Sequence, residues 1–253
     1  MREGSGQDWR PSASLDVLAL RASLLARLRG WFADHGVMEV ETPVLSAAAV
    51  TDPHLQTMET RAAGLSRYLH TSPEFCMKRL LAAGAGDIYQ ICRVFRDGEQ
   101  GRRHNPEFTM VEWYRLDLDM HGMMDEIESL LSTLAAGLRQ PGPAARLSYR
   151  ELCLRYADLD PFLAADRAIR QRLEDAGVPV PAGLDGDRDG LLDLLLAGVI
   201  EPALPARSPL FVFDFPTTQA ALARIRADDP PVAERFELFL GGMELANGFS
   251  ELN

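Results

Sequence analysis

The chain has 253 residues, 47% of them hydrophobic, so it is long enough to bury a sizeable core as one catalytic-sized domain. Thirty-seven acidic against 26 basic residues give a net charge of −11, which would repel a nucleic acid and argues against a dedicated RNA-binding protein. The three cysteines lack the spacing of a disulfide framework or a zinc site, and no window approaches the roughly 18 apolar residues of a membrane span, so we expect a cytoplasmic protein with reduced thiols.

The first expected element is a long amphipathic helix over residues 15–35, where leucines recur at helical spacing. Ser14 is suited to begin this helix and Gly36 to end it. A short edge strand should follow over residues 37–43 and end at Pro43, which cannot donate to a sheet ladder. Helix, glycine, strand and proline in this order are typical of a packing or dimerising element.

A further strand is expected over residues 68–71. The Ser-Pro-Glu sequence at residues 72–74 then begins a helix, with Pro73 at its first position. This helix should end at Gly84 or Gly86.

In the second half of the chain, apolar spacing predicts a helix over residues 120–138. Residues 147–206 form short helical stretches broken by proline, glycine and aspartate, which indicates a helical insertion in a β-rich core. Residues 210–215 are expected to form a buried strand, and residues 235–249 one or two strands around a Gly-Gly pair. The fold class predicted by this order is α+β.

The most informative segment is residues 94–114, where a polar turn lies between two strand-like apolar segments. Arg96 ends the first segment, and the turn contains Arg102, Arg103 and His104. Phosphate binding needs positive donors in fixed geometry, which the planar fork of arginine supplies better than lysine. We interpret the segment as an ATP-binding hairpin; the alternative is a solvated basic hairpin.

Beyond the turn, Glu112 and Tyr114 are two residues apart on one expected strand and therefore share a face. A carboxylate and a phenol on one face can seat a substrate ammonium group. Alternatively, Glu112 is a surface residue and Tyr114 a half-buried core aromatic.

Near the end of the sequence, Glu237, Glu244 and Glu251 recur every seven residues. The glycines between them argue against one continuous helix. In a strand-turn-strand arrangement Glu237 and Glu244 can converge on Mg²⁺, which takes one or two carboxylates together with phosphate oxygens and water. The alternative is three scattered surface glutamates. The sequence has no P-loop, serine-hydrolase or zinc-protease motif.

Taken together, these regions resemble the catalytic domain of class II aminoacyl-tRNA synthetases, specifically the lysyl branch. GVMEVETPVL looks like the first motif of that family, FRDGEQGRRHNPEFTMVEWYR like the second, and GGMELANGFSELN like the lysine-pocket segment. The resemblance runs from about residue 15 to residue 253, after a tail at residues 1–14, and implies an antiparallel sheet flanked by helices. Within the lysyl branch, the resemblance is strongest to the ligases that attach (R)-β-lysine to a lysine of elongation factor P. Three features favour these ligases: the segments TSPEFCMKRLLAAG and EWYR, and the acidic net charge.

The resemblance implies that Arg96 binds the α-phosphate of ATP and the substrate carboxylate, and balances charge as pyrophosphate leaves. Phe108 is expected to stack on adenine. Further ATP contacts are implied for Asp97, Glu99, His104, Asn105, Glu237, Glu244 and Leu245. Many second motifs carry an acidic residue two positions after the arginine, where this chain has Gly98, so either Glu99 takes that role or the role is vacant.

The resemblance also implies Mg²⁺ bound by Glu237 and Glu244, and a homodimer formed through the first-motif helix and Pro43. The lysine pocket is implied for Ser72, Pro73, Glu74, Tyr114, Asn247, Phe249 and Glu251. Within it Glu74 and Glu251 can pair with ammonium groups, because a buried ammonium needs such partners.

The sequence begins almost at the first motif, so we expect no OB domain and no binding of a tRNA anticodon. It ends at Asn253, before the third motif whose arginine contacts ATP, so we expect either a fragment or a truncated protein. Two alternatives to the ligase stay open, a lysyl-tRNA synthetase fragment and a catalytically inactive dimeric module that binds lysine or nucleotide. The choice between α-lysine and β-lysine is also open.

Overall fold

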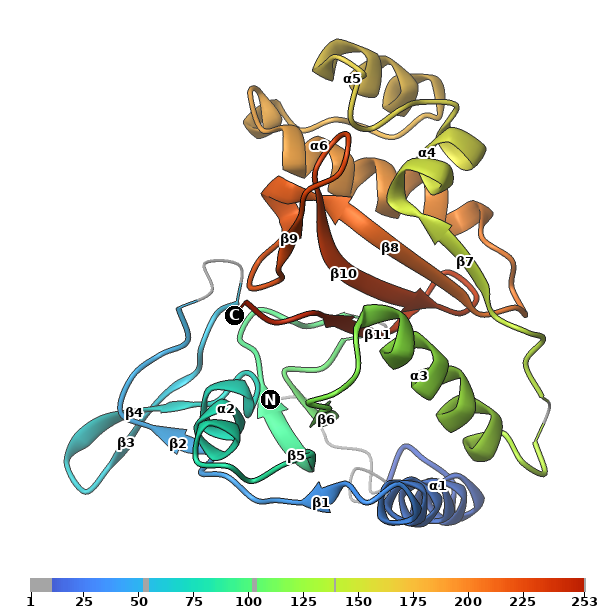
Figure 1. Ribbon diagram of the computed structural model, residues 1–253. Coiled ribbons are helices and arrows are strands. Elements are labelled where there is room, and N and C mark those ends of the chain that lie inside the picture. Colours follow the sequence, from blue (N-terminus) through green and yellow to red (C-terminus); the bar gives the residue numbers. More distant parts are fainter. Residues whose placement is uncertain (1–10, 52–54, 102–103, 139, 253) are drawn as a thin grey trace, which may run out of the picture. The chain divides into compact units, whose positions relative to one another are not determined.

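The computed structural model describes residues 11–51, 55–101, 104–138 and 140–252 (Figure 1). The chain separates into two compact units, Met1–Asp117 and Leu118–Asn253. Each combines helices with sheets that are mainly antiparallel, which confirms the predicted α+β class. In the described ranges, no helix is both long and apolar enough to cross a membrane.

The described part of the first unit contains the expected hairpin within a three-stranded sheet of order β1-β5-β6, and a smaller sheet of order β2-β4-β3. Its elements are α1 (Leu15–Asp34), β1 (Met38–Glu39), β2 (Leu45–Ser46), β3 (Glu59–Ala62), β4 (Leu65–Leu69), α2 (Glu74–Ala82), β5 (Ile88–Phe95) and β6 (Glu107–Tyr114).

Helix α1 forms as predicted, because Ser14 caps it by accepting a hydrogen bond from the backbone of Val17 at 3.4 Å. Gly36 follows the helix with a φ of +70°, a conformation that glycine adopts without strain. The helix packs on the sheet through Phe32, which is fully buried and stacks on Tyr89 with 4.1 Å between ring centroids.

Strand β1 is shorter than the predicted strand over residues 37–43. It pairs in parallel with β5 at the edge of the sheet, as an edge strand should. Val40 donates one further backbone hydrogen bond to the Tyr89 carbonyl at 2.8 Å, and the Thr42 hydroxyl donates to the Gln90 side chain at 2.9 Å. Pro43, which follows, has no backbone donor for a ladder.

The predicted start of α2 is wrong by one position. Pro73 is the N-cap of this helix and Glu74 its first residue, while the Ser72 hydroxyl accepts a hydrogen bond from the backbone of Glu74 at 3.0 Å. The helix ends before Gly84, whose φ of +87° suits a helix terminus, as predicted.

The second unit contains a sheet of order β11-β10-β8-β7, with β9 paired to β10. Its helices and helical turns are α3 (Met120–Leu134), α4 (Tyr149–Ala157), α5 (Asp166–Asp175), η1 (Ala182–Leu184), α6 (Arg188–Leu195), the π-helix η2 (Leu196–Ile200), η3 (Glu201–Ala203) and η4 (Thr217–Gln219). Its strands are β7 (Ala145–Ser148), β8 (Leu210–Pro216), β9 (Ile225–Arg226), β10 (Val232–Phe239) and β11 (Glu244–Phe249).

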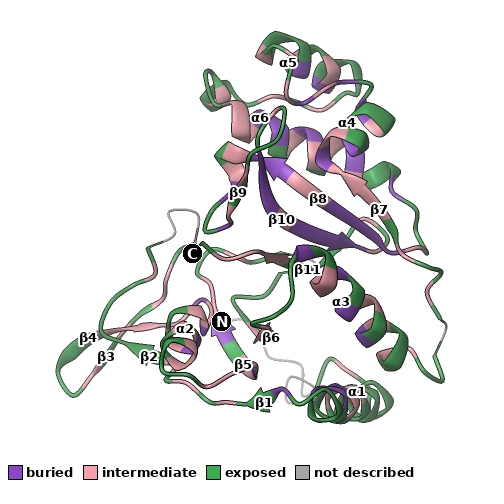
Figure 2. Ribbon diagram, in the orientation of Figure 1, coloured by how far each residue is buried: buried purple, intermediate pink, exposed green. Residues whose placement is uncertain are grey.

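The predicted strand at residues 210–215 is β8, and the segment at 235–249 contains two antiparallel strands, β10 and β11, with Gly241 and Gly242 in the connection. Helix α3 ends earlier than predicted, at Leu134. Figure 2 shows β8 and β10 as the most continuously buried strands of this unit.

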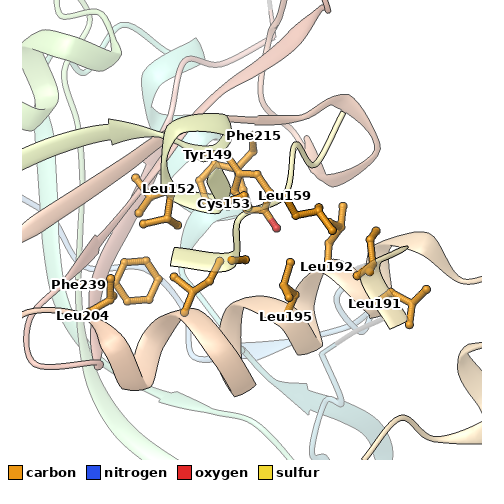
Figure 3. Packing of buried hydrophobic residues seen from close by; sticks show 14 of the residues in the cluster. Tyr149, Leu152, Cys153, Leu159, Leu191, Leu192, Leu195, Leu204, Phe215 and Phe239 are labelled. Atoms are coloured by element: carbon orange, nitrogen blue, oxygen red, sulfur yellow. The ribbon is translucent and has the colours of Figure 1, made fainter. Parts of the chain in front are cut away.

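The segment predicted as helical, residues 147–206, is helical from Tyr149 onward, whereas Leu147 and Ser148 belong to β7. Strand β7 pairs in parallel with β8, so the helices between them form the crossover connection. Apolar side chains from these helices supply much of one hydrophobic cluster, including Tyr149, Leu195 and Leu204, which packs against Phe215 and Phe239 of the sheet (Figure 3).

Candidate functional site

Arg96 lies just after β5, where the hairpin turn begins, and three groups hold its side chain. Its Nε donates to the Thr71 carbonyl at 3.3 Å, and its guanidinium lies 5.2 Å from the centre of the Phe108 ring. An ion pair of 3.6 Å joins it to Glu99. The strands pair in full register from Ile88 opposite Tyr114 to Phe95 opposite Glu107, which fixes where this turn starts. The arginine is therefore oriented at the mouth of the hairpin.

The two acidic residues of the turn have different surroundings. Asp97 accepts a hydrogen bond from the backbone of Gly98 at 2.9 Å, and its own backbone donates to the Gln56 carbonyl at 2.8 Å. Glu99 is the carboxylate that pairs with Arg96 and lines a hollow together with Gly98, Gln100 and His104. Whether Glu99 takes the role of the acidic residue that many second motifs carry stays a prediction; in the structure it forms an ion pair with Arg96.

His104 and Asn105 are exposed in the turn, and Phe108 is half-buried at the start of β6. Phe108 thus faces Arg96, next to the place where a nucleotide base was expected. Arg102 and Arg103, the other candidate phosphate ligands, lie outside the described residues.

A second cluster of the first unit centres on Glu112 of β6. Its two carboxylate oxygens accept from Ser72 Oγ at 2.6 Å and from Tyr114 Oη at 2.7 Å. The structure thus brings together Ser72 and Tyr114, two of the lysine-pocket residues implied by the resemblance, through Glu112, which the strand spacing alone had paired with Tyr114 as a possible ammonium seat. Its spacing of two residues from Tyr114 on one strand was the available signal.

Burial raises the pKa of Glu112 above its ordinary value, and the nearby Glu74 carboxylate adds to that rise. The hydrogen bonds from Ser72 and Tyr114 and the charge of Lys78 oppose it by favouring the ionised form. A cation placed beside Glu112 would lower its pKa, as the charge of Lys78 does, and so favour the ionised carboxylate. The cluster therefore has the chemistry of an ammonium site.

Glu74 adjoins this cluster from the first turn of α2 and accepts a hydrogen bond from Lys78 Nζ at 2.7 Å. Pro73, between Ser72 and Glu74, is buried, which fixes the backbone from which both side chains extend. Ser72, Pro73, Glu74 and Tyr114 of the predicted pocket are therefore close together in the first unit.

The remaining predicted residues belong to the second unit, on β10, β11 and the segment that follows. Glu237 is buried and lies opposite Asn247 in the strand pairing, whereas Glu244 and Leu245 are exposed at the start of β11. Asn247 Nδ2 donates to Glu244 Oε1 at 3.1 Å. Phe249 packs at the edge of the hydrophobic cluster, and Glu251 is half-buried and pairs by a backbone bridge with Ala223.

Glu237 and Glu244 repel each other electrostatically. Burial raises the pKa of Glu237 to about 7; the Arg235 guanidinium lowers it, and the Glu244 carboxylate raises it again. Two carboxylates in mutual repulsion are relieved by a divalent cation, and oxygen donors are what Mg²⁺ prefers. The pair fits a Mg²⁺ ion that shares its coordination with phosphate oxygens, although no group of three or more metal-ligating side chains occurs among the described residues.

Arg235 was missed by sequence reasoning. Its guanidinium contacts Glu237 Oε1, donates to the Gln219 carbonyl at 2.8 Å, and lies 4.6 Å from the centre of the Phe215 ring. The spacing of two residues on one strand, Arg235 to Glu237, was the available signal, as it was for Glu112.

A family model described as tRNA synthetases class II (D, K and N) matches residues 6–253. The chain is 50% identical over 250 residues to the elongation factor P (R)-β-lysine ligase of Erwinia tasmaniensis, covering 96% of this chain and 76% of that protein. Proteins of the same name from Yersinia enterocolitica and Salmonella typhi are 49% and 47% identical over the same shares of each chain.

Proposed function

This chain belongs to the class II tRNA synthetase family (D, K and N), and from that premise we propose that it is an ATP-dependent ligase that attaches (R)-β-lysine, or lysine, to a lysine side chain of elongation factor P. The observation that carries the proposal is the cluster of Ser72, Glu112 and Tyr114 beside Glu74, an acidic and half-buried arrangement suited to the ammonium group of a lysine-like substrate. The names of the similar proteins support the acceptor.

The reaction has two steps. The carboxylate of the amino acid attacks the α-phosphorus of ATP, forming an acyl-adenylate and releasing pyrophosphate. The ε-amino group of the acceptor lysine then attacks the acyl carbon, forming an amide and releasing AMP.

Arg96 serves the first step. Its positive charge stabilises the negative charge that develops on the α-phosphate, and its fixed contacts with Thr71 and Phe108 mean that little reorganisation is needed as the reaction proceeds. Glu112, Glu74 and Tyr114 bind the ammonium groups of the substrate and so orient its carboxylate. By resemblance to the family, Glu251, Asn247 and Phe249 are proposed to bind the same substrate, and His104, Asn105 and Leu245 to bind the nucleotide.

Glu237 and Glu244 would hold Mg²⁺, which, when bound, neutralises charge on the phosphates of ATP. Their mutual repulsion and oxygen donors support this assignment. Asp97 and Glu99 support the nucleotide side of the hairpin by shaping the turn after Arg96.

Exchange of labelled pyrophosphate into ATP tests the first step. We expect exchange that depends on (R)-β-lysine, weaker exchange with α-lysine, and a mass increase of one β-lysyl group on purified elongation factor P. Exchange at background with both amino acids would contradict the ligase. Charging of tRNA(Lys) instead of elongation factor P would favour a lysyl-tRNA synthetase fragment, and ligand binding without exchange an inactive module.

We also propose a cytoplasmic location, with which the three free cysteines are consistent.

A homodimer formed through α1 and Pro43 is part of the same proposal. Several apolar side chains near the start of α1 are exposed, with Leu15 at 80% and Val17 at 54%. A partner would cover such a surface. Light scattering at micromolar concentration should return twice the mass of the chain, 27.9 kDa; a monomer would contradict the dimer.

A further inference from the structure

The guanidinium of Arg235 makes three contacts within the second unit. It donates to the Gln219 carbonyl at 2.8 Å, contacts Glu237 Oε1, and stacks over the Phe215 ring at 4.6 Å. Its side chain is 24% exposed and that of Glu237 is 10% exposed, so water screens the pair only weakly. An arginine fork held this way loses little freedom when it binds a carboxylate.

The Gln219 contact belongs to a chain of polar contacts that reaches α6. The Gln219 side chain donates to Asp193 at 2.8 Å, and the neighbouring Thr218 donates to Asp189 at 2.7 Å. Arg235 is therefore fixed by a contact separate from the one with Glu237, and its guanidinium is already oriented when it contacts that carboxylate.

These contacts give Glu237 a cation in the absence of any ligand. One oxygen of its carboxylate is taken by Arg235, and the positive charge opposes the negative charges of Glu244 and Asp193, which both act on Glu237. A metal ion arriving from water must therefore compete with a guanidinium that is already in place. Mg²⁺ gives up its water reluctantly, so a weakened carboxylate pair is a poor site for the free ion.

We propose that Arg235 is the resident counter-cation of the Glu237–Glu244 pair and that it makes binding of a divalent metal depend on nucleotide. The proposal rests on the proposed function, in which the phosphates of ATP approach this pair. Arg235 reduces the negative charge and occupies a carboxylate oxygen that a free metal ion would need. The polyphosphate supplies negative charge and oxygen ligands in their place. Metal and nucleotide then arrive together, and the empty protein does not hold a metal alone.

The test is the affinity of the full chain for Mn²⁺ alone, measured by electron paramagnetic resonance without nucleotide, lysine or acceptor. Removing the charge in Arg235→Gln should tighten Mn²⁺ binding by roughly tenfold or more, because a nearby unit charge in a weakly screened site acts strongly on a divalent ion. Arg235→Lys keeps the charge and should stay within about threefold of wild type. A non-hydrolysable ATP analogue should tighten Mn²⁺ binding to wild type and largely remove the difference between the variants.

Arg224→Gln is the matched control, because Arg224 forms a 2.5 Å ion pair with Glu234 and does not contact Glu237. It should leave Mn²⁺ affinity unchanged; tightening equal to that of Arg235→Gln would reduce the effect to net charge and overturn the proposal. So would Arg235→Gln binding Mn²⁺ no more tightly than wild type. Should Arg235→Gln not fold, tight Mn²⁺ binding to nucleotide-free wild type overturns the proposal by itself. If pyrophosphate exchange fails while Arg235→Gln still binds Mn²⁺ tightly, the proposed function is wrong and the role of Arg235 stands.

Discussion

Ser72 and Glu112, forty residues apart in the sequence, are joined by a hydrogen bond of 2.6 Å from the hydroxyl to the carboxylate. The bond links Ser72, two residues before α2, to the second half of β6, and Tyr114 donates to the other oxygen of the same carboxylate at 2.7 Å. The proposed ammonium-binding cluster is therefore held together by its own hydrogen bonds, without a substrate.

Glu112→Gln should raise the KM for (R)-β-lysine by roughly 10- to 150-fold, because a hydrogen bond to a charged group contributes about 1.5–3 kcal/mol. The amide keeps the shape of the side chain but loses its charge. Pyrophosphate exchange at varied (R)-β-lysine concentration measures the change. Tyr114→Phe, which keeps the carboxylate, should have a smaller effect, and an unchanged KM in Glu112→Gln would remove this residue from the substrate site.

Arg96→Lys should lower kcat for pyrophosphate exchange by about 100-fold, since a point charge cannot reproduce the planar fork that faces the α-phosphate. Arg93→Lys is the control, because Arg93 lies on β5, three residues before Arg96, and forms an exposed ion pair of 3.6 Å with Glu107. Stopped-time exchange assays at saturating ATP compare the two. Equal losses in both variants would contradict a specific role for Arg96.

Gly248→Ala should destabilise the second unit by about 1–3 kcal/mol, the usual cost of overpacking. A Cβ at this position would lie 2.6 Å from a ring carbon of Phe236, which is fully buried and cannot move freely. Gly30→Ala is the matched control, because nothing lies within 4 Å of a Cβ there, and alanine inside helix α1 should add about 0.5–1 kcal/mol of stability. Thermal melting of both variants gives the comparison; an unchanged melting temperature for Gly248→Ala would show that the ring yields.

Cys92 should resist alkylation in the folded protein. Burial, reinforced by the nearby Glu112 carboxylate, raises its pKa from 9.0 to about 11. The reactive thiolate at pH 8 is therefore about a hundredfold rarer than in the denatured chain. Iodoacetamide labelling followed by peptide mass spectrometry should show that difference in rate, and Glu112→Gln should speed the native reaction. Similar rates in native and denatured protein would disprove the raised pKa.

Local patterns were sufficient to predict the elements that depend on neighbouring residues. The apolar spacing of α1, its Ser14 cap and the positive φ of Gly36 are local properties, and all three agree with the structure. The limits of β1 were wrong because they depend on its pairing with β5, where Met38 lies opposite Ile88, a residue far along the chain.

The candidate site shows the same division. Arg96, Glu99 and Phe108 could be chosen from one continuous motif, and they lie together. Glu112 was considered only together with Tyr114 of the same strand, and Arg235 was not selected, because their other partners lie on distant elements. A single sequence does not show that Ser72 contacts Glu112 or that Gln219 contacts Arg235.

The parallel pairing of β7 with β8 bears on how the second unit folds. Ala145 pairs with Leu210, and all of α4, α5 and α6 lie between them in the sequence. Such a pairing closes a long loop and loses chain entropy before its contacts can compensate, so it is intrinsically slow to form. Strand β10, which carries Glu237, pairs with β8 in turn, so we expect Glu237 to reach its native surroundings late in folding, after the helical crossover has collapsed onto the sheet.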